Sequence, residues 1–187
     1  MKKTVCILLG ILFFPPAQYA VHIDVGISYG PIRMNDAQIK NVYGDGYVYS
    51  PYMNVHIGKG FFASVGYEGG YTKSGTIGLY NDPTTFKLHG VEFFLGFQKR
   101  IQFIVTFIKV GGGYYFYKQT FESPYLKEFQ VDSQEVGGAF NGGIKLIPFK
   151  GVFFSGEIKY VYLMDKPLEE KVNLGGLRFM AGLGFSI

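Results

Sequence analysis

Eight charged side chains recur at alternate positions of segments that otherwise hold small or apolar residues. They are Asp24, Glu68, Glu92, Lys109, Lys145, Glu157, Lys159 and Arg178. Side chains of successive strand residues point to opposite faces, so these charges share a face that lies opposite rows of aliphatic and aromatic residues. Four acids balance four bases, and buried charges are stable only when paired. The pattern predicts a network of ion pairs inside a barrel, with an ion path or proton relay as the alternative.

Partners for these charges are expected on neighbouring strands. We expect Glu92 to pair with Lys109, and Lys145 with Glu157. Arg178 is expected to pair with Glu157 or Asp24. An eight-stranded barrel is only wide enough for side chains to fill it, so such a network would close the lumen.

Histidine and serine could add catalytic or metal-binding chemistry. The three histidines are His22, His56 and His89, and none is interpreted as having a further histidine, cysteine or carboxylate at metal-ligand spacing. His89 and Glu92 are three residues apart and point to opposite faces of one strand, which disfavours a Ser–His–acid set. The sequence therefore predicts no enzyme activity, no cofactor and no metal site.

The elements that position the charges are indicated by alternation with period two. The last strand, residues 174–187, places Leu177, Phe179 and Leu183 on one face and Arg178 among glycines on the other. Similar alternation gives about eight strands, near residues 21–30, 47–57, 61–71, 86–98, 101–116, 136–147, 152–162 and 174–187. A bulge is expected at Gly90, because Phe86 and Leu88 are out of phase with the residues that follow.

Connections of alternating length complete the pattern. Short turns are expected at residues 58–60, 98–102 and 148–151, and long loops at 33–46, 72–85, 118–134 and 165–171. An even strand count, with short turns at one rim and long loops at the other, is typical of an all-β, eight-stranded antiparallel up-and-down transmembrane β-barrel. The short turns and both chain ends should then face the periplasm. Aromatic residues at strand ends fit interfacial girdles; they are Tyr47, Tyr49, Tyr67, Tyr71, Tyr114, Phe116, Tyr160 and Tyr162.

Composition agrees with a membrane barrel of one domain. Hydrophobic residues make up 48% of the chain, yet after the N-terminal segment no run is long enough for a membrane helix. The chain has 27 Gly, 15 Tyr and 19 Phe, which suits twisted strands. A secreted calycin-like barrel is the alternative architecture, and it would hold its aromatic residues inside and its charges outside.

Residues 1–20 resemble a secretory signal peptide, and residues 21–187 form the predicted barrel domain. Lys2 and Lys3 precede an apolar stretch that ends at Pro15, and Ala20 suits a cleavage site. Cleavage would remove Cys6, the only cysteine, so no disulfide or thiolate metal site is expected. It would also lower the formal charge from +4 to about +2, which argues against nucleic-acid binding.

Three segments resemble the small eight-stranded outer-membrane barrels of the OmpA, OmpX and OmpW type. The segment 110–116 (VGGGYYF) is similar to their Gly-rich Tyr-Tyr strand, 151–163 (GVFFSGEIKYVYL) to their penultimate strand, and 175–185 to their last. The resemblance implies a monomer in the cell outer membrane. Its partners would be outer-membrane lipid, lipopolysaccharide and, through Phe185 in the last strand, the barrel-assembly machinery.

The expected function is non-enzymatic: a structural or surface-interaction barrel with a salt-bridged, closed lumen. Passage of small hydrophobic solutes is a first alternative, because Phe62, Phe94, Tyr115 and Phe153 are predicted to project inward. A lipid A-modifying barrel enzyme is a second alternative, since such enzymes occur in this size class.

Overall fold

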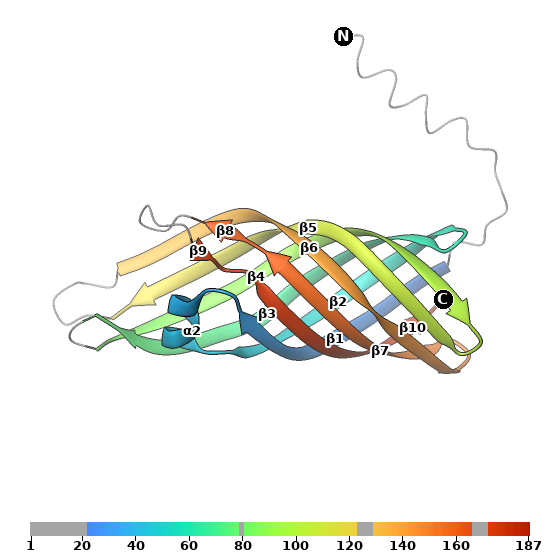
Figure 1. Cartoon of the computed structure of the whole chain (residues 1–187), viewed down its shortest axis with the longest axis horizontal. Helices are drawn as coiled ribbons and strands as arrows, with labels where there is room; N and C mark the ends of the chain where they lie inside the picture. The colour runs from blue at the N-terminus through green and yellow to red at the C-terminus, as the bar shows by residue number, and fades with distance from the viewer. Residues whose placement is uncertain (1–21, 79–80, 123–128, 166–171) are drawn as a thin grey trace, which may run out of the picture.

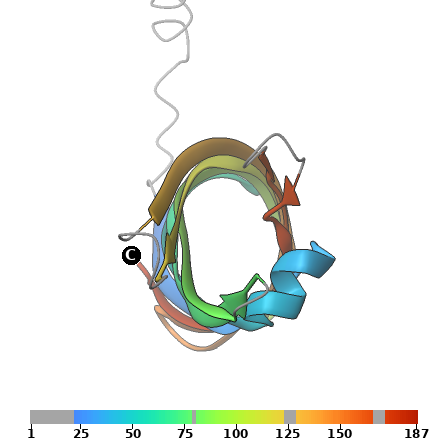
Figure 2. The same cartoon turned by 90° about the vertical axis from the view of Figure 1, so that its left-hand side faces the viewer.

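A computed structural model describes residues 22–78, 81–122, 129–165 and 172–187. The predicted signal peptide lies outside these described residues. Figure 1 shows an elongated barrel of tilted strands, and Figure 2 shows its closed wall from one end. The elements, in chain order, are β1 (His22–Met34), α2 (Ala37–Tyr43), β2 (Gly46–Gly58), β3 (Phe61–Ile77), β4 (Asp82–Ile101), β5 (Ile104–Phe121), β6 (Phe129–Phe149), β7 (Val152–Tyr162), β8 (Met164–Asp165), β9 (Val172–Asn173) and β10 (Gly176–Ser186).

Eight of the strands form one closed antiparallel barrel. Neighbouring strands follow the order β1-β10-β7-β6-β5-β4-β3-β2, and β1 closes the ring against β2. The short strands β8 and β9 form a separate two-stranded sheet. The predicted eight-stranded up-and-down barrel is confirmed.

The two faces of the wall have the chemistry that a transmembrane barrel requires. The outward positions of β7 are Val152, Phe154, Gly156, Ile158, Tyr160 and Tyr162, with no charged residue among them. Ile158 is 53% exposed on this outer face, whereas Glu157 beside it is 5% exposed. Large apolar side chains stay exposed around the barrel only where lipid covers them. This arrangement excludes the calycin-like alternative, in which the apolar face lies inside.

Four strands run well past the length that a membrane needs. β4 has 20 residues and β6 has 21, whereas β7 and β10 have 11 each. The predicted loops at 72–85 and 118–134 are therefore wrong over most of their length, because β3–β4 and β5–β6 continue as paired strands. These extensions lie at the end of the barrel that carries α2, on the left of Figure 1.

The predicted bulge at Gly90 is also wrong. The pairing of β4 with β5 runs in one register from Thr84 to Ile101. The irregularity lies instead in β3, between Glu68 and Tyr71, where Gly70 has a φ of 93° that few residues other than glycine adopt. The bulge turns Tyr71 into the barrel, so Tyr71 does not belong to the outer girdle.

A short helix interrupts the predicted loop at 33–46. The carboxylate of Asp36 accepts hydrogen bonds from the backbone N–H of Gln38 and Ile39, at 2.9 and 3.1 Å, and so caps α2. The cap places Tyr43 against the end of the barrel, where Tyr43 is buried. Within the described residues, no helix is long and apolar enough to cross a membrane.

Candidate functional site

The barrel interior holds all eight of the charged side chains singled out in the sequence. Each is at most 6% exposed, and Arg178 is 0% exposed. They form three groups: one in the middle of the barrel around Glu68, one around Glu157, and one around Asp24 near the short turns.

The central group joins strands that are not neighbours in the wall. Arg178 of β10 donates from Nη2 to Glu68 Oε1 of β3 at 2.9 Å, and from Nη1 to the carbonyl of Gly176 at 2.6 Å. Lys159 contacts Glu68 and lies 2.8 Å from Oε2 of Glu92. Because β3 and β10 lie apart in the strand order, these long side chains reach across the lumen.

Hydroxyl and amide groups donate hydrogen bonds to the carboxylate of the second group. Glu157 accepts hydrogen bonds from Ser28 Oγ at 2.6 Å, Asn141 Nδ2 at 2.9 Å and Ser155 Oγ at 3.1 Å. The ammonium of Lys109 instead lies over aromatic rings, 4.9 Å from the centre of Phe94. A cation over a ring face is attracted by its quadrupole, so Lys109 is stabilised inside the barrel.

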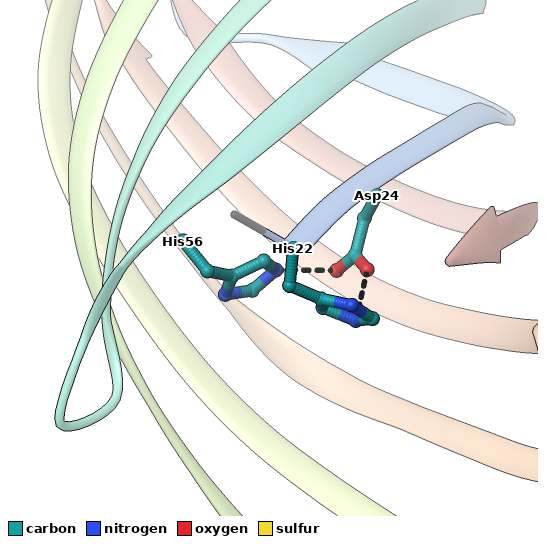
Figure 3. A group of neighbouring side chains, drawn as sticks. All are labelled: His22, Asp24 and His56. Atoms are coloured by element: carbon teal, nitrogen blue, oxygen red, sulfur yellow. Dashed lines mark hydrogen bonds and ion pairs between the residues drawn. The ribbon is translucent and has the colours of Figure 1, made fainter. Parts of the chain in front are cut away.

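The third group lies at the end of the barrel that carries the short turns. Asp24 of β1 accepts hydrogen bonds from Lys145 Nζ and Ser186 Oγ, both at 2.6 Å. His56 Nε2 lies 3.0 Å from Asp24 Oδ2, and His22 Nε2 lies 3.4 Å from Asp24 Oδ1. Figure 3 shows both imidazole rings turned towards this one carboxylate.

The expected pairings within the network are corrected by these contacts. Lys145 pairs with Asp24 instead of Glu157, and Arg178 pairs with Glu68 instead of Glu157 or Asp24. Lys159, not Lys109, bonds to Glu92. The expectations failed because they considered adjacent strands, whereas lysine and arginine reach across the lumen.

An apolar layer fills the barrel beyond the central charges, towards α2. Phe86 and Leu88, together with Tyr71, pack in this layer, which also includes Ile32. Tyr43 of α2 contacts Phe86 and shares a hydrogen bond of 2.8 Å with Thr84 Oγ1. Burial raises the pKa of the Tyr43 hydroxyl, so the hydroxyl stays neutral and keeps this bond.

Phe62, Phe94, Tyr115 and Phe153 all point into the barrel, as expected, and are at most 4% exposed. Phe94 and Tyr115 also belong to the apolar cluster, and all four rings lie close to charged groups. Phe62 and Phe153 lie beside the ammonium of Lys145, and Tyr115 donates a hydrogen bond of 2.7 Å to Glu92 Oε1. These aromatic rings therefore complete the charged layers.

The contacts give little support to hydrolytic chemistry. His89 is exposed on the outer face while Glu92 is buried inside, so these two residues do not act together. Near the short turns, Ser186 Oγ donates to Asp24 Oδ1 at 2.6 Å, and no hydrogen bond joins it to a histidine among the described residues.

The proximity of His22, Asp24 and His56 was missed from the sequence. His22 and Asp24 are two residues apart and share the inner face of β1, and His56 is the register partner of His22 on β2. The period-two alternation of both strands placed these three residues on the inner face. The sequence did not show which residues of β1 and β2 are paired, because the helix in the connection between them was not recognised.

A closed eight-stranded wall, apolar outside and filled with paired charges inside, defines the class of small outer-membrane β-barrels. Known structures share this fold. They include Ail, the attachment invasion locus protein of Yersinia pestis, in complex with the heparin analogue sucrose octasulfate (TM-score 0.59, 13% identity, 90% of this chain and 100% of Ail covered). The outer membrane protein OprG of Pseudomonas aeruginosa matches with a TM-score of 0.68 at 9% identity, over 90% of this chain and 96% of OprG.

A major outer membrane protein of Thermus thermophilus also matches, with a TM-score of 0.65 at 9% identity, over 90% of this chain and 100% of that protein. No family model matches the sequence, and no curated protein is significantly similar to it. At such identities the similarity shows the fold. Combined with the apolar outer belt, this fold assigns the protein to the outer membrane, as predicted.

Proposed function

We propose that the protein is a non-enzymatic outer-membrane scaffold with a closed lumen, which uses its long strands as a binding surface outside the cell. The observation that carries this proposal is the filled interior. Side chains of β3 and β10 meet across the middle of the barrel, and an apolar layer lies above them. Eight strands leave little room for a channel beside such a filling.

The long strands support the surface role. A membrane is crossed by about 9–11 residues of a tilted strand, so the remaining residues of β4 and β6 project about 20 Å beyond it. On this projecting wall, Lys87 pairs in register with Lys118. Two like charges directly opposite each other repel. Asp132, the register partner of Lys118 on β6, offsets part of this repulsion, and a bound anion would relieve the rest.

Anionic carbohydrate, including the phosphorylated sugars of lipopolysaccharide, is therefore the class of ligand proposed for this surface. The complex of Ail with a sulfated sugar is an example on the same fold, although the similarity between the chains is in fold alone. A monomeric state, signal cleavage near Ala20 and assembly through β10 are parts of the same proposal.

Passage of small hydrophobic solutes has less support, because the inward aromatic residues contact lysine ammonium groups and a glutamate. A lipid A-modifying enzyme also has less support, because the contacts described above contain no serine activated by a histidine.

Planar-bilayer conductance tests the closed lumen. The purified barrel should give no steady current, and a porin measured in the same bilayers shows that the membrane reports open channels. A heat-unfolded sample of the barrel controls for leaks. Steady currents that depend on the solute would refute the closed scaffold.

Binding to immobilised heparin tests the surface role separately. The double variant Lys87→Gln/Lys118→Gln should be retained less than the wild type, and Lys99→Gln/Arg100→Gln at the opposite rim is a control that removes the same charge. Equal retention of the two double variants would refute the proposed surface.

A further inference from the structure

Two histidines and an aspartate converge at the rim of the barrel that carries the short turns. His22 and His56 are register partners on β1 and β2, and their ring centres are 5.1 Å apart. Asp24 lies two residues further along β1, on the same inner face as His22. Figure 3 shows the three side chains gathered at one point, from two adjacent strands.

The spacing of their donor atoms suits a metal ion. One ligand atom from each residue lies within 4.8 Å of the other two, and the contacts to Asp24 are 3.0 and 3.4 Å long. Nitrogen and oxygen ligands about 2.1 Å from a tetrahedral zinc ion are roughly 3.4 Å apart, and the two histidine contacts to Asp24 already have about this length. The His22 side chain is 50% exposed, which leaves the site an open approach from solvent.

Gln98 gives a second observation that points to a ligand. Its Nε2 lies 3.3 Å from His56 Nδ1, while its Oε1 is buried and has no hydrogen-bond partner. Rotation of this amide by half a turn would let Oε1 accept the Nδ1–H of His56. The His56 Nε2 would then carry a lone pair facing Asp24, which is how outer residues orient metal-binding histidines.

We propose that His22, Asp24 and His56 bind one divalent transition-metal ion of the zinc type at the periplasmic rim. Imidazole and carboxylate ligands favour such ions over calcium or magnesium. Lys145 opposes binding, because its ammonium donates to Asp24 at 2.6 Å. The same Nζ also lies 4.9 Å from the centre of the Phe153 ring, a cation–π contact that does not involve Asp24.

Isothermal titration calorimetry of the folded, tag-free barrel with zinc chloride tests the proposal. The wild type should bind one ion per barrel in a saturable manner. His22→Ala and His56→Ala should weaken binding at least about tenfold, and Gln98→Leu should weaken it by about 10–100-fold, as is usual for a residue that orients a ligand. Lys145→Met should bind zinc more tightly than the wild type, because a repelling charge is removed.

His89→Ala is the matched control, since His89 is the third histidine of the chain and lies on the outer face. It should bind zinc as the wild type does. Heat-modifiable migration on a gel verifies that each variant is folded before titration, and the half-exposed His22 allows a replacement that leaves the packing intact. The proposal is overturned if the wild type shows no saturable binding, or if His22→Ala and His89→Ala bind alike. It does not depend on whether the lumen conducts.

Discussion

Removal of the charge of Glu68 is expected to destabilise the barrel strongly. In Glu68→Gln, Lys159 keeps Glu92 as its partner, but the guanidinium of Arg178 is left without a carboxylate. Arg178 is 0% exposed, so water does not replace the lost partner. Breaking a buried pair typically costs about 3–5 kcal/mol. For a domain of this size, 1 kcal/mol shifts the unfolding temperature by about 2–4 °C, so a decrease of about 6–20 °C is expected.

Thermal unfolding in detergent, followed by circular dichroism, measures this decrease. Lys40→Gln is the control, because its pair with Asp45 is 3.9 Å long and exposed, and such pairs contribute about 0–1 kcal/mol. The double variant Glu68→Met/Arg178→Met removes the pair as a unit and should lose less stability than the sum of the two single variants. The reasoning is refuted if Glu68→Gln unfolds at the same temperature as Lys40→Gln, or if the double variant is additive.

Two further predictions concern the wall of the barrel. Ile158→Lys places a charge on the lipid face near mid-membrane and should reduce folding stability in bilayers by about 2–4 kcal/mol, whereas Phe149→Lys near the short turns should cost about 0–1 kcal/mol. Equal costs in lipid-vesicle refolding would contradict this orientation. A Cβ at Gly111 would collide with the backbone carbonyl of Phe93, but a Cβ at Gly138 would meet open space. Gly111→Ala should therefore abolish refolding and Gly138→Ala should leave it intact, and similar yields of folded barrel would show that this close approach is not required.

The side chains that face the lumen could be predicted from the sequence, because period-two alternation fixes each strand's phase without any knowledge of its partners. Glu157 and Ile158 illustrate this, since Glu157 faces the lumen and the adjacent Ile158 faces outwards, as expected. Phase is lost where the backbone departs from regular pleating. The bulge at Gly70 turns Tyr71 from the expected outer face to the inner face. No local sequence pattern indicated that the bulge lies at Gly70 and not at Gly90.

The partners of the charges could not be predicted from phase. Glu68 and Arg178 are 110 residues apart in the chain and meet across the lumen, so their contact depends on the tilt and stagger of the whole barrel. The contact between His22 and His56 depends on the register between β1 and β2. This register could not be predicted, because the Asp36-capped helix lies in the connection between the two strands.

The central claim is that the apolar face contacts lipid while the opposite face fills a closed lumen. Nuclear Overhauser effects between lipid acyl chains and isoleucine methyl groups, measured in nanodiscs, test it without any mutation. Ile27, Ile108 and Ile158 are 50–55% exposed on the outer face, and Ile32 is 0% exposed inside. The account predicts contacts from acyl chains to the first three and none to Ile32. Acyl contacts at Ile32, or their absence at the three outer residues, would contradict the account.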